Sequence, residues 1–297
     1  MRLTNKHKLP DAIFKAVSND PYSRGKADIS VTQLCDSPRL VQLYKRHADK
    51  MSEDVSDRLF SLLGQAVHHI LHRAADDNAL TEERLFIEVN GYKLSGSPDV
   101  FTNDGTLIDY KVSKAQVLSM DTKETWLMQL RTYAWLLRKH GFEVKKAQLC
   151  VLIRDWWKFQ ALRDHEYPQA PMAMVDVPLW PDEKIQKWIE ERVMLHKGAD
   201  LIKDDSLPDC SDKETWRKEA AWAVVKDGSR RAFRVFDNVA EAEACLDNQV
   251  RLKCFKGKIV YRPGEATRCE HYCLAKSAGV CSQYNRSVPQ GLESVKI

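Results

Sequence analysis

Two tight-turn signals constrain the fold of this chain more than any other feature. Asn90-Gly91 separates two runs that read as strands, 85–89 and 92–101, and this dipeptide is the strongest short-range hairpin signal. Asn103-Asp104-Gly105 then leads into a third run, 106–112. The pattern predicts a three-stranded antiparallel meander.

Helices are expected on both sides of this meander. Apolar residues recur at three/four spacing before it, which predicts a helix with one buried face: Leu59, Leu62, Leu63, Ala66, Val67, Ile70 and Leu71. A second helix is predicted from about Asp121, where residues 121–124 resemble a capping box, to Gly141. A fourth strand follows at 147–153. The predicted order is helix, three strands, helix, strand, which makes this an α/β chain.

The flanking regions suggest a division into three parts. Residues 1–54 look irregular or helical, with a short helix near 40–47. Residues 55–200 form the core, which ends in a Trp- and Pro-rich loop and a helix over 181–197. Residues 201–297 form a small α+β C-terminal extension with a Cys-rich tail; strands are expected near 221–225, 232–236 and 258–261, with a helix near 239–247.

Composition is that of a globular protein. The 297 residues are 43% hydrophobic and 30% charged, with 46 Lys+Arg against 42 Asp+Glu, a balance that excludes wholesale disorder. No apolar run approaches the ~18 residues that span a bilayer, and the N-terminus lacks the apolar region of a secretory signal. We therefore expect a cytoplasmic protein with no membrane contact. Both ends are basic, which suits a phosphate-binding surface as well as an ordinary solvated one.

Two carboxylates and a lysine form the first candidate site. Asp99 and Asp109 lie on adjacent predicted strands, and oxygen ligands suit Mg²⁺ or Mn²⁺. Lys111 lies two residues beyond Asp109 and so points to the same face. The site requires a particular register. A two-residue loop would place Asp99 opposite Tyr110, whereas a three-residue loop over 103–105 pairs Asp99 with Asp109. We predict the three-residue loop or an equivalent bulge.

The two helices contribute further candidates. His68 lies one turn after Gly64, whose missing side chain is expected to allow another group to approach closely. His68 and His72 have the spacing of a zinc protease helix, but position 69 is His rather than the general-base Glu, so we do not favour that class. Gln129 and Tyr133 share a face of the second helix and are candidates to contact substrate, although a lone Tyr is more often packed in a core.

Together these motifs resemble a known family. Their order, Gly64-x3-His68, Gly96-x2-Asp99, Asp109-x-Lys111 and Gln129-x3-Tyr133, resembles the RecB-like branch of the PD-(D/E)XK nuclease superfamily over about residues 55–155. The resemblance implies a restriction-endonuclease-like core and metal-dependent hydrolysis of DNA.

The resemblance also implies roles for individual residues. Mg²⁺ or Mn²⁺ is expected to bind His68, Asp99, Asp109 and the backbone carbonyl of Tyr110. Lys111 is expected to position the attacking water. Gln129 and Tyr133 match the accessory helix motif of the family.

Three of the eight cysteines crowd into the tail. Cys269, Cys273 and Cys281 resemble the tail of RecB-like and AddB-like nucleases that carry a [4Fe–4S] cluster, which needs four thiolates. Cys210 is favoured as the fourth ligand, with Cys35 as the alternative. Structural Zn²⁺ is the alternative metal, for which His271 is a further candidate ligand.

The expected function is therefore a DNA nuclease, most simply an exonuclease in recombination, repair or phage DNA metabolism, from a phage or a bacterium. Its substrate is single- or double-stranded DNA. A separate helicase, recombinase or single-strand-binding protein is a candidate partner, because the chain has no Gly-x4-Gly-Lys-Ser/Thr loop. Two alternatives remain, a CRISPR-adaptation nuclease that trims prespacers and a non-catalytic DNA-binding protein with a nuclease fold.

Overall fold

The computed structural model describes residues 1–19, 25–75, 78–119 and 123–287. Contacts between residues group the chain into two compact units, unit 1 (Met1–Pro208) and unit 2 (Asp209–Ile297). None of the helices in the described ranges combines the length and the apolar character needed to cross a membrane.

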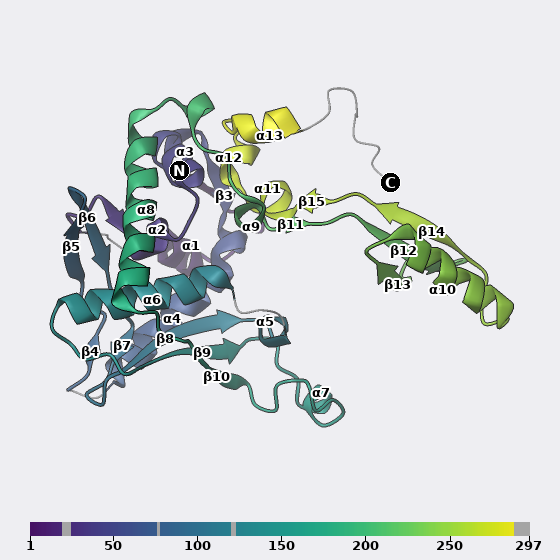
Figure 1. Cartoon of the computed structure of the whole chain (residues 1–297), viewed down its shortest axis with the longest axis horizontal. Helices are drawn as coiled ribbons and strands as arrows, with labels where there is room; N and C mark the ends of the chain where they lie inside the picture. Colours follow the sequence, from purple (N-terminus) through teal and green to yellow (C-terminus); the bar gives the residue numbers. More distant parts are fainter. Residues whose placement is uncertain (20–24, 76–77, 120–122, 288–297) are drawn as a thin grey trace. The chain divides into compact units, whose positions relative to one another are not determined.

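Unit 1 is built on a five-stranded sheet with the order β10–β9–β8–β7–β4 (Figure 1). Its strands, in chain order, are β4 (Leu80–Thr81), β7 (Val100–Phe101), β8 (Thr106–Ser113), β9 (Lys146–Ile153) and β10 (Met172–Asp176). Only β8 and β9 are parallel to each other. Parallel neighbours need a crossover connection, and α6 (Glu124–Lys139) supplies it.

The predicted meander is divided between two sheets. β5 (Leu85–Val89) and β6 (Tyr92–Gly96) form a hairpin across Asn90-Gly91, where both turn residues have positive φ. β2 (Ile29–Ser30) adds in parallel to β6, giving a second sheet with the order β2–β6–β5. The strand predicted over 92–101 is interrupted between Gly96 and Val100, since Pro98 has no N–H to donate to a ladder. The chain passes here from one sheet to the other.

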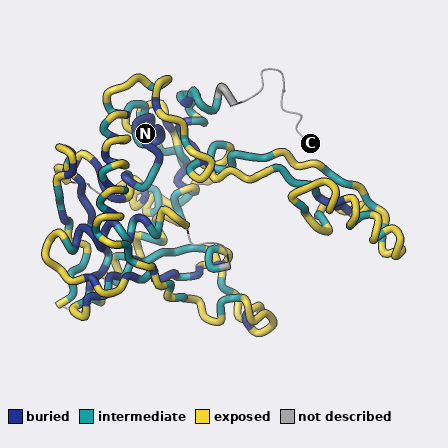
Figure 2. Tube along the Cα trace, viewed as in Figure 1, coloured by how far each residue is buried: buried dark blue, intermediate teal, exposed yellow. Residues whose placement is uncertain are grey.

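The core lies between the sheets and two long helices (Figure 2). α6 buries half of its positions, including Leu130, Leu136 and Leu137, and α8 (Asp182–Leu201) buries Ile185 and Ile189. α6 begins at Glu124 after Lys123, which makes no side-chain capping bond; the predicted start at Asp121 and Thr122 lies outside the described residues. It ends as predicted before Gly141, whose φ is +89°.

α4 (Leu59–Arg73) confirms the predicted first helix but not its burial. None of its residues is buried, and Leu63 and Ile70 are 42% and 57% exposed. Only one edge of α4 faces the five-stranded sheet, near His68 and Tyr110. Hydrophobic periodicity identifies the apolar side of a helix but not what lies against it, so the predicted buried face was wrong.

The N-terminal region contains more structure than expected. β1 (Arg2–Thr4) pairs in parallel with β3 (Ser52–Asp54). The helix predicted near 40–47 is α3 (Pro38–Arg46).

Unit 1 also contains short helices that were not predicted. They are α1 (Asp11–Ser18), α2 (Val31–Leu34), α5 (Gln116–Ser119), α7 (Lys158–Ala161) and the 3-10 turns η1 (Ala48–Lys50), η2 (Val55–Arg58) and η3 (Asp204–Ser206). These segments are too short to show a periodicity.

Two arginines of α3 hold the last segment of unit 1. Arg46 donates to the carbonyl oxygens of Ala199 (2.8 Å) and Ile202 (2.8 Å), at the end of α8, where helix carbonyls lack intrahelical partners. Arg39 is fully buried and donates to the carbonyls of Leu207 and Pro208. The chain leading to Cys210 is therefore fixed to α3.

Unit 2 contains a small sheet and a Cys-rich helical segment. The sheet has the order β13–β12–β14, formed by β12 (Ala221–Lys226), β13 (Ala232–Phe236) and β14 (Gly257–Arg262), with α10 (Val239–Arg251) between β13 and β14 in sequence. These are the predicted strands and helix. The remaining elements are α9 (Asp212–Thr215), β11 (Arg217–Lys218), β15 (Glu265–Ala266), α11 (Thr267–His271), α12 (Leu274–Ser277) and α13 (Ser282–Ser287).

Charge is segregated within this small sheet and its helix. Residues 221–236 and 251–262 carry nine Lys/Arg and one acidic residue, Asp227, whereas 237–250 carry four acidic residues and no Lys or Arg. No ion pair involves these nine cations within the described part of the chain. The strands and the segment after α10 are thus basic, and α10 is acidic.

Candidate active site

The register of β7 and β8 determines how the candidate carboxylates meet. Val100 pairs with Ile108 and Phe101 with Leu107, so the same register brings Asp99, the residue before β7, opposite Asp109. The backbone N–H of Thr102 donates to the carbonyl of Thr106 (3.0 Å), which leaves residues 103–105 as the loop. The predicted three-residue loop is confirmed.

Asp99 and His68 meet at the peptide of Tyr110. The Tyr110 N–H donates to Asp99 Oδ2 (2.7 Å), and Asp99 Oδ1 lies 3.3 Å from His68 Nδ1. His68 Nε2 lies 3.1 Å from the Tyr110 carbonyl oxygen. The hydrogen bond to Asp99 raises the pKa of His68, and the charge of Asp109 raises it further. These groups come from α4, from β8 and from the residue before β7, and they converge on one point of β8.

Asp109 is the most deeply buried of the candidates, with only 2% of its surface exposed. Its Oδ2 lies 2.6 Å from Lys111 Nζ, but that oxygen accepts no hydrogen bond of good geometry within the described residues. Burial and, to a smaller extent, the charge of Asp99 raise the pKa of Asp109 to about 6 against the opposing charge of Lys111. The site thus holds a buried carboxylate that lacks full compensation of its charge.

Lys111 is held by a relay from α6. Its Nζ donates to Gln129 Oε1 (3.1 Å), and Gln129 Nε2 donates to the Tyr133 hydroxyl (3.1 Å). Tyr133 is only 5% exposed and belongs to the core, so it contacts Gln129 rather than the surface. The predicted pair, Gln129 and Tyr133, is therefore in contact, and Gln129 lies between Tyr133 and Lys111.

Gly96 explains how Tyr133 comes so close to the sheet. A Cβ at Gly96 would lie 2.9 Å from Tyr133 Cε1 and 2.9 Å from Leu136 Cδ2, closer than real Cβ contacts. Gly64 was expected to play such a part, but a Cβ there would meet no atom of the described residues within 4 Å. The expectation that another backbone comes close to Gly64 was therefore wrong.

Sequence reasoning missed Trp126. Lys111 Nζ lies 6.0 Å from the centre of its ring and Lys123 Nζ lies 4.9 Å from it, distances at which a cation is attracted to an aromatic face. Trp126 precedes Gln129 by one helical turn, so the two side chains share a face of α6. This spacing could have identified Trp126 as a neighbour of the site.

The donor set suits a hard divalent cation. Two carboxylates, an imidazole and a backbone carbonyl are oxygen and nitrogen donors of the kind such ions prefer, and a cation would add to the charge compensation that Lys111 gives the buried Asp109. The side chains are not yet turned towards one ion. Asp99 faces the Tyr110 amide and Asp109 faces Lys111, and no three His, Cys, Asp or Glu side chains of the described ranges are arranged to ligate a metal.

The three tail cysteines lie along the segment from α11 to the start of α13 in unit 2. Cys273 and Cys281 are buried and Cys269 is half-buried, all as free thiols. Burial raises the pKa of Cys269, and the charges of Cys273 and Cys281 raise it further. The backbone N–H groups of Ala275 and Lys276 bond to Cys273 and favour its thiolate, although burial has the larger effect and raises its pKa.

Cys210 is tied to the same segment. Its N–H donates to Gln283 Oε1 (2.8 Å), and Gln283 Nε2 donates to its carbonyl (2.9 Å). His271, the alternative zinc ligand, instead has Nε2 2.7 Å from Glu265 Oε1. Cys35 lies in unit 1, at the end of α2, where burial raises its pKa to about 12.

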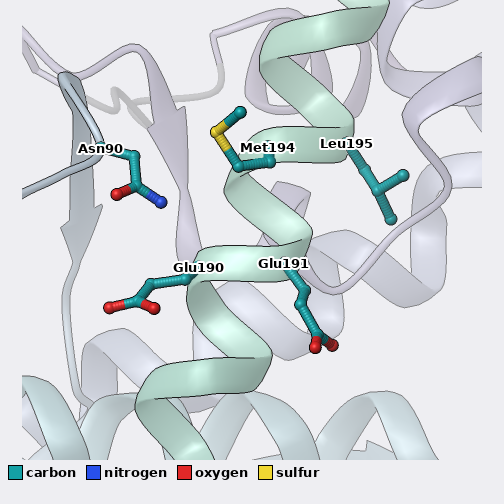
Figure 3. Close-up of a pocket in the computed structure, with 5 residues that line it drawn as sticks. All are labelled: Asn90, Glu190, Glu191, Met194 and Leu195. Atoms are coloured by element: carbon teal, nitrogen blue, oxygen red, sulfur yellow. The ribbon is translucent and has the colours of Figure 1, made fainter.

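A surface hollow of unit 1 does not belong to the candidate site. It is lined by Asn90, Glu190, Glu191, Met194 and Leu195, on α8 and the β5–β6 turn (Figure 3). None of these residues contacts the cluster around Asp109.

A comparison with protein-family models agrees with the motifs. The sequence model of the PD-(D/E)XK nuclease superfamily matches residues 30–278. Among solved structures, the crystal structure of SSO0001 is similar to this chain at 20% identity and a TM-score of 0.47, covering 69% of this chain and 87% of that one. No curated protein sequence matches at a significant level.

Proposed function

Because the chain belongs to the PD-(D/E)XK nuclease superfamily, we propose that it is a Mg²⁺- or Mn²⁺-dependent DNA exonuclease of the RecB-like branch. Family membership implies a metal-dependent phosphodiesterase acting on DNA. The observation that carries the proposal is the convergence of His68, Asp99, Asp109 and Lys111 on one stretch of β8.

The proposed metal ligands are His68, Asp99, Asp109 and the Tyr110 carbonyl. When bound, the cation would supply positive charge at the phosphate and acidify a water molecule. To act as a ligand, His68 must lose the proton that Asp99 favours, whereas Asp109 has a second oxygen, Oδ1, besides the one that faces Lys111.

The other residues act on the water and the phosphate. Lys111 is proposed to orient the attacking water and to stabilise the negative charge that develops on the phosphate oxygens. Gln129 limits where the ammonium can go, because its Oε1 accepts from Nζ, and Tyr133 in turn fixes the Gln129 amide. Gln129 and Tyr133 are therefore positioning residues.

The first test is Asp109→Asn. We expect metal-dependent cleavage to fall about a thousandfold, because a neutral amide is a poor ligand for a hard cation. DNA binding in EDTA should stay close to wild type. The matched control is Asp176→Asn, an exposed carboxylate on β10, which should cleave normally. Unchanged cleavage by Asp109→Asn would refute the site.

The choice of DNA substrate tests the exonuclease proposal. An exonuclease degrades end-labelled linear DNA, single- or double-stranded, but leaves a covalently closed circle intact. Cleavage of the circle at a comparable rate would show an endonuclease. A role in recombination, repair or phage DNA metabolism, with a separate helicase, recombinase or single-strand-binding protein, is part of the same proposal.

We further propose that Cys210, Cys269, Cys273 and Cys281 hold a [4Fe–4S] cluster with a structural role. Three observations support it: the mutual electrostatic influence of the tail thiols, the backbone N–H groups directed at Cys273, and the double hydrogen bond that joins Cys210 to Gln283. Four thiolates are the usual ligands of such a cluster.

Metal content tests the cluster directly. Protein purified without oxygen should be brown, absorb at about 400 nm and contain iron and sulfide in equal amounts. Cys273→Ser should lose the colour and melt at a lower temperature, whereas Cys254→Ser, an exposed thiol of the same unit, should keep both. A colourless protein with stoichiometric zinc would favour the structural Zn²⁺ alternative.

A further inference from the structure

A long connection beside the candidate site, residues 154–171 between β9 and β10, is called the aromatic arm below. Lys111 pairs with Val151 of the neighbouring strand, so the chain enters the arm just beyond the level of Lys111. At its base, the Arg154 N–H donates to the Ser113 carbonyl (2.9 Å) and the Ala115 N–H donates to Asp155 Oδ1 (2.7 Å). Figure 1 shows the arm and α7 extending past the ends of β9 and β10. The arm thus begins at the end of β9, next to the end of β8 that carries Lys111.

Hydrogen bonds within the arm fix its shape. Trp156 Nε1 donates to the Pro168 carbonyl (2.7 Å). The Tyr167 hydroxyl accepts from the Trp157 N–H (3.1 Å) and donates to the Asp155 carbonyl (3.3 Å). Such cross-links between the two sides of a loop limit its conformations. The arm is therefore a preorganised element.

The arm presents apolar side chains to solvent. Trp157 is 56% exposed, Phe159 60% and Leu162 69%. The Trp157 and Phe159 rings are neighbours, with centroids 5.9 Å apart and planes inclined by 60°. Exposed aromatic clusters of this kind mark interaction sites.

Exposed cations lie on and beside the arm. Lys114, Lys158 and Arg163 are exposed, and none of them forms an ion pair in the part of the chain that the structure describes. Two of the arm's three carboxylates are hydrogen-bonded to backbone amides, Asp155 to Ala115 and Asp164 to Glu166. The cations are left available beside the exposed rings.

We propose that the aromatic arm binds the DNA strand next to the scissile phosphate, with a base stacked on Trp157 and Phe159. Aromatic rings stack on bases of any sequence while nearby cations contact the backbone. The arm presents exposed rings and cations beside the end of β8 that carries Lys111. The arm would thereby hold a single-stranded end in place while the phosphate reaches Lys111. This inference rests on the proposed function only in taking DNA as the ligand.

The test measures binding in EDTA, so that no cleavage occurs. The full chain is titrated into a single-stranded oligonucleotide that carries 2-aminopurine near its end. We expect wild type to quench the probe by stacking and Trp157→Ala to lose the quenching, with a Kd about 5- to 150-fold higher. Trp157→Phe should restore most of the affinity, and Leu162→Ala, which removes an equally exposed aliphatic group, should bind like wild type.

An abasic oligonucleotide separates stacking from a structural effect. Without bases, wild type and Trp157→Ala should bind with the same Kd. Equal binding and equal quenching by wild type and Trp157→Ala on normal DNA would overturn the proposal and leave the arm as a surface for a protein. If wild type binds through Trp157 but does not cleave with Mg²⁺ or Mn²⁺, only the proposed nuclease function fails.

Discussion

Gly96 and Gly64 show how two glycines of one motif differ. Ala at Gly96 would press a methyl group against Tyr133 and Leu136, and overpacking of this kind costs about 1–3 kcal/mol. Because Tyr133 holds Gln129 and Gln129 holds Lys111, Gly96→Ala should also reduce kcat.

Gly64→Ala is the matched control. The added methyl has open space within the described residues, and Ala is favoured over Gly inside a helix by about 1 kcal/mol. Thermal unfolding should show Gly96→Ala less stable than wild type and Gly64→Ala more stable. A stabilised Gly96→Ala with normal kcat would contradict the relay.

At the scale of single residues, sequence alone identified the polar groups that meet around β8. His68, Asp99, Asp109 and Lys111 follow from side-chain periodicity, which is a local property. The burial of Tyr133 and the packing of Gly96 depend on how α6 lies against the sheet, which no local pattern specifies. The roles of these residues in catalysis stay predictions.

At the scale of elements, the loop after β7 determines the alignment of the carboxylates. Deleting Asn103 would shorten it to two residues and move Asp99 opposite Tyr110, so that one carboxylate leaves the site. We expect cleavage to fall to the level of Asp109→Asn, measured beside far-ultraviolet circular dichroism to show that the fold persists.

The control is Asn103→Ala, which removes an exposed side chain but keeps three residues in the loop. The register should then be unchanged, so cleavage should persist. Normal cleavage without Asn103 would show that the site does not depend on this register.

Long or strongly patterned elements were predicted and short ones were not. The β5–β6 hairpin, α6, β9 and the elements of unit 2 have clear turn signals or periodicity. β10 was missed because Met172–Asp176 follows a loop rich in Pro and Trp, and only its pairing with β9 makes it a strand. Tertiary pairing of this kind overrides local propensity.

At the scale of the whole molecule, the chain is more than a nuclease core. Unit 1 carries the candidate active site and unit 2 carries both the tail cysteines and the small basic sheet. A net charge of +4 conceals this arrangement, because the acidic residues of α10 offset the neighbouring cations in any sum over the chain.

The segregated charge of unit 2 bears on how the protein responds to ionic strength. Replacing Arg230, Arg231 and Arg234 together by Ala should lower the slope of log Kd against log salt by up to about 2 to 3, since each phosphate contact contributes roughly 0.7 to 0.9. Fluorescence anisotropy in EDTA measures this, with Glu243→Gln on α10 as the control. An unchanged slope would show that these arginines do not touch DNA.

The nine cations without ion pairs therefore have a thermodynamic consequence. Part of the drive for DNA binding would come from the small ions that the DNA sheds as each arginine or lysine replaces them. Binding driven by this release is favoured by entropy, and it weakens as the salt concentration rises.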